Sequence, residues 1–116
     1  MSKFELEFEA FFKKKKISFT RNDRQKFGTP DFSFKGNGTE IVLFLHGCYW
    51  HGHNCKEWKL SSFGLSRQAA SIFKDQEVFS YYMKKPNFRY LRCWECEYED
   101  NKNYHLEKIY NSIFEL

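Results

Sequence analysis

Apolar residues near the start of the chain recur with the spacing of an amphipathic helix. Four phenylalanines at i, i+4, i+7 and i+8 share one face, and acidic residues lie between them. Ser2 and Glu5 have the spacing of a capping box, which places the start of the helix at Ser2. We expect the helix to end within the lysine run at residues 13–16, because cations stabilise the carboxyl end of a helix. The apolar face consists of Phe4, Phe8, Phe11 and Phe12.

Two apolar segments in the middle of the chain predict a β-hairpin. Residues 31–35 and 41–46 flank a Gly-Asn-Gly sequence, which is a strong turn signal between strands. Residues 41–45 are apolar without a break, as expected of a strand that is buried on both faces. A further short strand is predicted over residues 17–20, and the polar residues 21–29 are expected to form a loop.

The second half of the chain alternates between irregular and periodic segments. Residues 47–66 have no period and are rich in Gly, His, Ser and Trp, which predicts a long functional loop. A helix is predicted over residues 67–84, a strand over 88–94 and a last helix over 104–114. The apolar positions of the two helices are Ala70, Phe73, Val78, Tyr81, Leu106, Ile109, Tyr110 and Ile113. The order αβββαβα predicts a single α/β domain over residues 1–116, with a mixed sheet flanked by helices.

Length, composition and charge restrict the class of protein. A chain of 116 residues is one domain, and its 21% aromatic residues can fill a core, which argues against disorder. No apolar run approaches the roughly 18 residues of a membrane helix, and acids interrupt the apolar N-terminus, so no signal peptide is expected. We therefore expect a soluble, cytoplasmic domain. The net charge of +4 is compatible with a polyanionic partner.

Three metal-binding side chains, Cys48, His53 and Cys55, lie so close in sequence that one loop can wrap around a single ion. In a reducing compartment such a cluster favours zinc over disulfides, and a structural zinc needs four ligands. The fourth is either Cys93 or Cys96. Cys93 lies within a predicted strand, where a small core residue is expected, whereas Cys96 lies beyond its end and can reach a loop. We therefore prefer Cys96; the alternative is a set of free thiols and an exposed histidine.

An aspartate and two histidines form a second candidate centre. Asp31 begins one predicted strand, His46 ends the next, and His51 lies in the loop that follows. An aspartate at a strand end can bind Mg²⁺, and a neutral histidine can take a proton from an attacking water. Taken singly, Asp31 could be a turn residue, His46 a core histidine, Glu5 a helix cap and Asp75 a solvated carboxylate.

Three motifs together resemble the very-short-patch-repair (Vsr) endonucleases. They are GTPDF at residues 28–32, HGCYWHGHNC at residues 46–55 and WECE at residues 94–97. The matching order extends over about residues 3 to 98, and the middle string is long and specific. The resemblance implies a restriction-endonuclease-like, PD-(D/E)XK-related fold and Mg²⁺-dependent nicking of one DNA strand.

The resemblance also implies a role for individual residues. Asp31 binds Mg²⁺ together with the backbone carbonyl of Leu45, His51 acts on the attacking water, and His46 contacts phosphate. The zinc ligands are Cys48, His53, Cys55 and Cys96. Glu5 on the first helix and Asp75 on the second match two further acids of the family, and the related EDxHD homing endonucleases also use such a set.

DNA contacts follow from the same resemblance. The aromatic pair Tyr49 and Trp50 is expected to wedge into the base stack beside the target, because an inserted ring kinks the duplex and replaces lost stacking. The alternative is that Trp50 packs over the zinc loop. Cationic and aromatic residues could line the phosphate path. These residues are Arg21, Arg24, Lys56, Trp58 and Lys59.

This chain departs from the family in two ways, and both concern the choice of DNA target more than the nuclease centre. We expect the family's N-terminal arm to be missing, and residues 56–74 form a shorter segment without the family's Phe-Trp element. Three functions therefore stay open: a nicking enzyme of T:G mismatch repair, a related site-specific or homing endonuclease that cuts matched DNA, and a zinc-stabilised DNA-binding module without catalysis. The presence of Asp31, His46 and His51 disfavours the third.

Partners and source follow by analogy with the family. We expect double-stranded DNA as the substrate, a MutL-type mismatch-repair protein as a partner, a monomeric state and no association with membranes. The richness in Phe, Lys and Asn suggests an AT-rich bacterial or phage genome.

Overall fold

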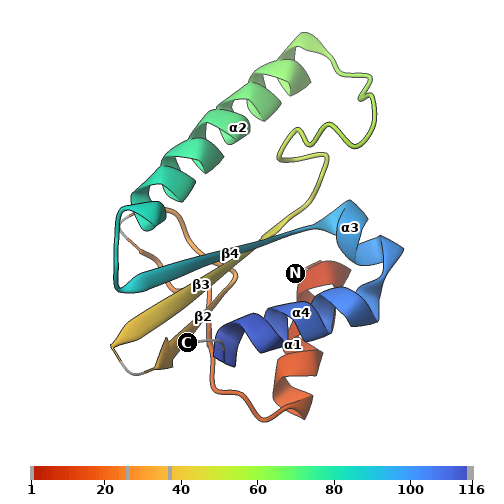
Figure 1. Cartoon of the computed structure of the whole chain (residues 1–116). Coiled ribbons are helices and arrows are strands. Elements are labelled where there is room, and N and C mark those ends of the chain that lie inside the picture. Colours follow the sequence, from red (N-terminus) through yellow and green to blue (C-terminus); the bar gives the residue numbers. More distant parts are fainter. Residues whose placement is uncertain (1, 26, 37, 115–116) are drawn as a thin grey trace.

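The computed structural model describes residues 2–25, 27–36 and 38–114, and Figure 1 shows the path of the chain. The elements are α1 (Lys3–Lys14), β1 (Thr20–Arg21), β2 (Phe32–Gly36), β3 (Thr39–His46), α2 (Ser62–Met83), β4 (Phe88–Trp94), α3 (Glu95–Asp100) and α4 (Lys102–Phe114). The predicted order is confirmed, except that α3 was not expected. None of the helices in the described ranges combines the length and apolar character needed to cross a membrane.

The four strands form one mixed sheet in the order β1-β2-β3-β4. β1 pairs with β2 and β2 with β3 in antiparallel fashion, whereas β3 and β4 run parallel and are connected through α2. Helices α1 and α4 lie on one face of the sheet and α2 covers the other (Figure 1). The predicted hairpin is confirmed by the β2–β3 pairing; Asn37, the middle residue of its turn, lies outside the described residues.

The strand β3 is buried on both faces, as its continuous apolar sequence predicts. Ile41, Leu43 and Leu45 pack into the cluster that includes the phenylalanines of α1, while Val42 and Phe44 face α2. Because side chains alternate along a strand, an unbroken apolar run supplies both layers of the core. β3 is thus the central element on which the two helical layers rest.

The first helix matches its prediction at both ends, but the strand after it begins later than expected. The Ser2 hydroxyl accepts the Glu5 N–H at 3.2 Å, which is the predicted cap. At the other end Lys16 has a φ of 58°, and the Ile17 N–H donates to the Phe12 carbonyl, which together form a Schellman turn. This turn includes Ile17, the residue that was expected to start the strand, and β1 occupies 20–21 instead of 17–20.

One predicted helix starts earlier than expected, and one helix was not predicted at all. α2 begins at Ser62, where the Ser61 side chain caps the helix by accepting the Gly64 N–H, so the irregular loop is shorter than expected. α3 follows β4 directly and is anchored by Tyr98, whose buried ring packs against Phe4 and Phe8 of α1.

The periodicity of α2 identifies the helix but not its buried side. Val78 and Tyr82 pack against the sheet, whereas Ala70 and Phe73 are exposed, the latter with 65% of its surface accessible. The last helix agrees better, since Ile109 and Ile113 are both buried. Several large apolar side chains on the outer side of α2 are exposed. The buried residues of this helix could therefore not be assigned from apolar spacing alone.

Candidate active site and metal cluster

One end of the sheet forms a cavity of about 560 Å³. Asp31 immediately precedes β2 and His46 ends β3, and because these strands are antiparallel both residues lie at the same edge. The first turn of α1 and the middle of α2 close the cavity from the two faces of the sheet. The six residues predicted for catalysis and Mg²⁺ binding all line it: Glu5, Asp31, Leu45, His46, His51 and Asp75.

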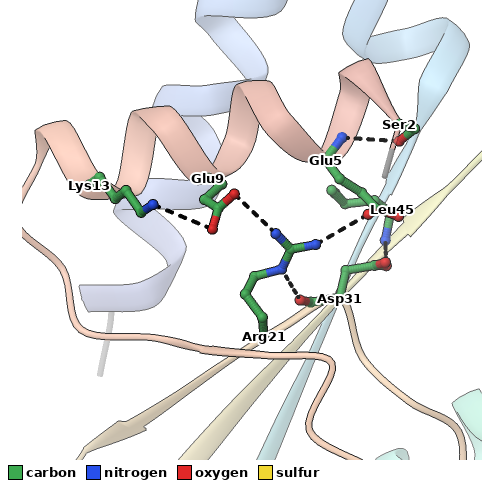
Figure 2. A network of polar contacts seen from close by, with 7 residues as sticks. All are labelled: Ser2, Glu5, Glu9, Lys13, Arg21, Asp31 and Leu45. Atoms are coloured by element: carbon green, nitrogen blue, oxygen red, sulfur yellow. Dashed lines mark hydrogen bonds and ion pairs between the residues drawn. The ribbon is translucent and has the colours of Figure 1, made fainter.

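The carboxylate of Asp31 is held by the backbone of the neighbouring strand. Its Oδ2 accepts the Leu45 N–H at 2.7 Å, as Figure 2 shows. Burial raises the pKa of Asp31 to about 6; the Leu45 hydrogen bond opposes this shift, and the nearby carboxylate of Glu5 adds to it. Two carboxylates that approach each other in a partly buried cavity are the kind of site that a divalent cation stabilises.

The opposite wall of the cavity carries a histidine–aspartate pair. His51 Nδ1 and Asp75 Oδ2 are 2.6 Å apart, and these residues come from the loop after β3 and from the middle of α2. An ionised carboxylate can only accept a hydrogen bond, so a neutral His51 ring placed this way carries its proton on Nδ1 and has a lone pair on Nε2. The pair thus has the chemistry of an oriented general base.

His46 stacks on His51, with ring centroids 3.9 Å apart and an angle of 9° between the planes. Its side chain is buried, and Nδ1 has no hydrogen-bond partner among the described residues. Burial lowers the pKa of His46 to about 4, and repulsion from the stacked His51 ring, when that ring is protonated, acts in the same direction. His46 is therefore a neutral imidazole at neutral pH, with an unused nitrogen.

The predicted zinc ligands meet beside this cavity. One ligand atom from each of Cys48, His53, Cys55 and Cys96 lies within 4.8 Å of all the others. Of the two candidates for the fourth ligand, Cys96 is in the cluster, and Cys93 is buried in the core at 4% exposure. The structure thus places Cys96, and not Cys93, in the cluster, and the role of Cys96 as a zinc ligand stays a prediction.

The spacing within the cluster fits a tetrahedral ion. His53 Nδ1 lies 3.6 Å from Cys48 Sγ and 3.5 Å from Cys96 Sγ. Bonds of about 2.3 Å to sulfur and about 2.1 Å to nitrogen give a tetrahedron whose S···N edge is about 3.6 Å. Trp94 stacks on the His53 ring at 4.0 Å and fixes its orientation. The cluster can therefore hold a zinc ion with little rearrangement.

One residue of the aromatic pair, Trp50, lies at the cavity, and both rings are exposed. Tyr49 is 41% and Trp50 61% exposed, and Trp50 lines the cavity. The buried Gln68 of α2 donates its side-chain N–H to the Tyr49 carbonyl and so holds this turn, while Arg67 stacks over the Trp50 ring at 5.7 Å. Among the described residues, Trp94 is the ring that stacks on the predicted zinc ligand His53.

The expected phosphate contacts differ in accessibility. Arg24, Lys56 and Lys59 are exposed, and Lys56 lies over the Trp58 ring. Arg21 has only 15% of its side chain exposed, and its guanidinium is bound to Glu5 and Glu9 of α1. Arg21 therefore lies inside the network around Asp31 (Figure 2).

Three residues that the sequence reasoning missed belong to the same region. Lys74 and Glu95 line the cavity, and Gln68 holds the turn of the aromatic pair. Two of them had a usable signal, since Lys74 precedes the candidate Asp75 and Glu95 precedes the candidate ligand Cys96. Gln68 had none, because a single amide on a helix carries no pattern.

The mixed sheet, the carboxylates at its edge and the adjacent histidine–aspartate pair are consistent with the PD-(D/E)XK class of nucleases. The sequence model of the family described as DNA mismatch endonuclease Vsr matches residues 2–57. These residues include Asp31, His46, His51 and three of the four predicted zinc ligands.

Individual relatives extend the similarity. The Type II nicking enzyme V.NmeAIP of Neisseria meningitidis serogroup A is 28% identical over 102 residues, which is 84% of this chain and 70% of the relative. The Type II nicking enzyme V.XorIIP of Xanthomonas oryzae is 34% identical over 77 residues, 63% of this chain and 54% of the relative. The DNA mismatch endonuclease Vsr of Escherichia coli K12 is 30% identical over 84 residues, 69% of this chain and 52% of the relative.

The chain is similar in sequence to the Vsr family of DNA endonucleases. It spans about half the length of the Xanthomonas and Escherichia relatives and 70% of the Neisseria one. The family resemblance inferred from the three motifs is thereby confirmed, whereas substrate and metals need their own arguments.

Proposed function

We propose that this chain is a Mg²⁺-dependent endonuclease that nicks one strand of duplex DNA. The observation that carries the proposal is the meeting of Asp31 and Glu5 with the His51–Asp75 pair in one cavity at the edge of the sheet. One wall offers oxygen ligands for a hard cation, and the other offers a general base. Hydrolysis of a phosphodiester needs both functions within reach of one phosphate.

The ligands of Mg²⁺ are Asp31, the Leu45 carbonyl and, directly or through water, Glu5. This assignment is supported by the raised pKa of Asp31, which reflects burial and the adjacent Glu5 carboxylate and which a divalent cation would relieve. When bound, Mg²⁺ neutralises the negative charge that builds on the phosphate. The hydrogen bond from the Leu45 N–H keeps the Asp31 carboxylate in one orientation.

His51 is the general base in this proposal. Its Nε2 takes the proton from the attacking water, and the positive charge that forms on the ring is stabilised by Asp75 at Nδ1. His46, neutral because of its lowered pKa, donates a hydrogen bond to a phosphate oxygen and helps to place the scissile bond. Its unpartnered Nδ1 is a reason to expect a ligand there, because a buried polar atom is seldom left unsatisfied.

The zinc ion has a structural role in this scheme. Cys48, His53, Cys55 and Cys96 hold it and so join the loop after β3 to the start of α3. Burial raises the pKa of the Cys48 thiol to about 12, so a cation is needed to stabilise the thiolate. The loop that carries His51 and the aromatic pair has little apolar content of its own, and zinc would order it.

The aromatic pair and the exposed cations form the DNA-binding surface. Tyr49 and Trp50 enter the base stack beside the scissile phosphate; in support, both rings are exposed and Trp50 lines the cavity. Arg24, Lys56 and Lys59 contact the phosphate backbone. The target is a T:G mismatch in DNA repair; the alternative is a matched site, as for a homing or mobile-element enzyme, and the relatives carry both mismatch and nicking names.

The remaining family analogies are proposals as well. They comprise a monomer that acts in the cytoplasm of a bacterium, or of a cell infected by a phage, and that cooperates with a MutL-type protein. Co-purification with such a protein, and light scattering of the isolated chain, would test the partner and the monomeric state separately.

The experiment is Mg²⁺-dependent cleavage of end-labelled duplexes that are identical except for one T:G mismatch. Wild type is compared with Asp31→Asn and with Asp100→Asn, an exposed aspartate outside the cavity. Nicking of only the mismatched strand supports the repair enzyme, and equal cleavage of matched DNA supports the site-specific alternative. Binding without cleavage by wild type would leave a DNA-binding module, and full activity of Asp31→Asn would remove Asp31 from the mechanism.

A further inference from the structure

Arg21 lies on the short edge strand β1 and makes three polar contacts with neighbouring residues. The phosphate contact predicted for Arg21 from the sequence requires none of them. Its Nε donates to the Asp31 carbonyl at 3.1 Å, one terminal nitrogen lies 3.2 Å from Glu5 Oε2, and the other lies 3.3 Å from Glu9 Oε2. Its guanidinium carbon lies 4.5 Å from the centre of the Phe32 ring. Figure 2 shows the side chain reaching from β1 to the underside of α1.

These contacts connect two elements that each supply one carboxylate to the cavity. Glu5 comes from the first turn of α1, and Asp31 comes from the start of β2. Arg21 links these two elements through polar contacts, since it binds the side chain of Glu5 and the backbone of Asp31. Hydrophobic packing fixes the distance between helix and sheet but not the orientation of a flexible glutamate.

We propose that Arg21 is a positioning residue for the metal site: its guanidinium holds the Glu5 carboxylate beside Asp31, in the orientation needed to bind a divalent cation. The inference rests on the proposed function in so far as the cation is the one used in DNA cleavage. It assigns Arg21 a different role from the phosphate contact that its charge suggests. A side chain that is 15% exposed and whose guanidinium is bound by two carboxylates has little left to offer a DNA backbone.

The geometry requires arginine and not merely a positive charge. The three acceptors, on Asp31, Glu5 and Glu9, are met by three nitrogens of one planar fork. A lysine ammonium can reach one or two of them but cannot stack on Phe32 and orient Glu5 at the same time. The two effects of Arg21 on a nearby cation also oppose each other, because its charge repels the cation while its hydrogen bonds arrange the ligands.

Because the charge of Arg21 and its hydrogen bonds have opposite effects on Mg²⁺ affinity, the sign of the change in affinity on replacing Arg21 shows which effect is larger. We would titrate zinc-loaded, DNA-free protein with Mg²⁺ and measure binding by calorimetry for wild type, Arg21→Lys, Arg21→Met and Glu9→Gln. Loss of a residue that orients metal ligands typically weakens metal binding by 10–100-fold, so we expect about a tenfold weaker affinity for both Arg21 variants. Glu9→Gln is the matched control, because Glu9 binds the same guanidinium but does not line the cavity, and it should change the affinity less than about threefold.

A second readout separates positioning from DNA contact and from stability. DNA binding without Mg²⁺ should be unchanged in Arg21→Lys and Arg21→Met, including its dependence on salt. If Arg21 contacts phosphate instead, Arg21→Met lowers the slope of log affinity against log salt by about one. Cleavage should need more Mg²⁺ for half-maximal rate, while the rate at saturating Mg²⁺ recovers to within a few-fold of wild type.

Three results would overturn the inference. Unchanged or tighter Mg²⁺ binding by Arg21→Met would show that Arg21 acts only through its charge or not at all. A lower melting temperature with unchanged Mg²⁺ affinity would make Arg21 purely structural. A reduced salt slope would return it to the DNA surface. If wild type binds Mg²⁺ through Glu5 and Asp31 but cleaves no DNA, the proposed function fails and the positioning role stands.

Discussion

His51 Nδ1 lies 2.6 Å from Asp75 Oδ2, although 24 residues separate the two in the chain. The hydrogen bond joins the loop after β3 to the middle of α2, so the helix sets the rotation of the imidazole ring. The second nitrogen of His51 is thereby presented to the cavity that also contains Asp31. Among the described residues, the pair is the best-defined candidate for accepting a proton from water.

Replacement of Asp75 by asparagine tests this pair. The amide introduced by Asp75→Asn no longer stabilises a protonated His51 and can donate to Nδ1, which favours the wrong tautomer. We expect the rate of DNA cleavage at saturating Mg²⁺ to fall by about 10²–10⁴-fold. DNA affinity should stay within about twofold of wild type, because Asp75 is assigned no contact with DNA. Single-turnover cleavage and binding by anisotropy measure the two quantities.

The matched control for Asp75→Asn is Glu77→Gln on the same helix. Glu77 is exposed and lies outside the cavity, so the same change from acid to amide should leave cleavage unchanged. An Asp75→Asn variant that cleaves DNA at the wild-type rate would exclude His51–Asp75 as the base.

Zinc binding is tested by two cysteines that sequence alone left in competition. Cys96→Ser should reduce the bound zinc to well below one per chain and lower the melting temperature sharply, since structural zinc contributes several kcal/mol or more to folding. Cys93→Ser should keep its zinc, because Cys93 is packed in the core and lies outside the ligand cluster. Metal analysis after dialysis and thermal unfolding give both quantities. Stoichiometric zinc in Cys96→Ser, or zinc loss confined to Cys93→Ser, would contradict the assignment.

The predictable features of this fold are those encoded in contiguous residues. The unbroken apolar run of β3 predicts burial on both faces, and the antiparallel hairpin then brings Asp31 and His46 to one edge of the sheet. The tight spacing of Cys48, His53 and Cys55 likewise needs only one loop to form a cluster. In each case a local pattern determines a local geometry, and the site follows from it.

Features that depend on contacts between distant residues were not predictable in this way. The helix α3 is stabilised by the packing of Tyr98 on α1, and the sequence around Tyr98 contains no pattern that predicts this contact. The charge of Arg21 suggested a DNA contact. The sequence did not show that Arg21 is largely buried, because that burial depends on the position of α1 above β1. Phe73 has core-like spacing but is exposed, since α2 presents only part of its apolar surface to the sheet.

The raised pKa of Asp31 leads to a prediction about the stability of the fold. Burial raises its pKa from 3.8 to about 6, so between these values the folded chain holds a proton that the unfolded chain has released. Stability from this group is therefore greatest at low pH and is lost as the pH rises through about 6. Asp31→Asn, which has no charge to bury, should be about 1–3 kcal/mol more stable than wild type at pH 7.5 without Mg²⁺.

The advantage of Asp31→Asn should shrink towards pH 5, where wild-type Asp31 is protonated in the fold. It should also shrink when Mg²⁺ is added at pH 7.5, because the cation binds and stabilises only wild type. Urea unfolding of zinc-loaded protein under these conditions measures the difference. Equal stabilities at pH 7.5, or a gain that grows on acidification, would mean that Asp31 is not a destabilising buried acid.

The last prediction concerns the contribution of Trp50 to DNA binding, not to the cleavage step. If its exposed ring enters the base stack, Trp50→Ala loses about 1–3 kcal/mol of stacking, a reduction of DNA affinity by about 5–150-fold. Phe73→Ala is the control, since that ring is similarly exposed at 65% but lies outside the cavity, and it should bind DNA as wild type does. A fluorescent base analogue beside the scissile phosphate should brighten on binding wild type, because its neighbour is unstacked, and should not respond to Trp50→Ala. Equal fluorescence and affinity for both variants would place the ring on the surface of the complex instead of within the stack.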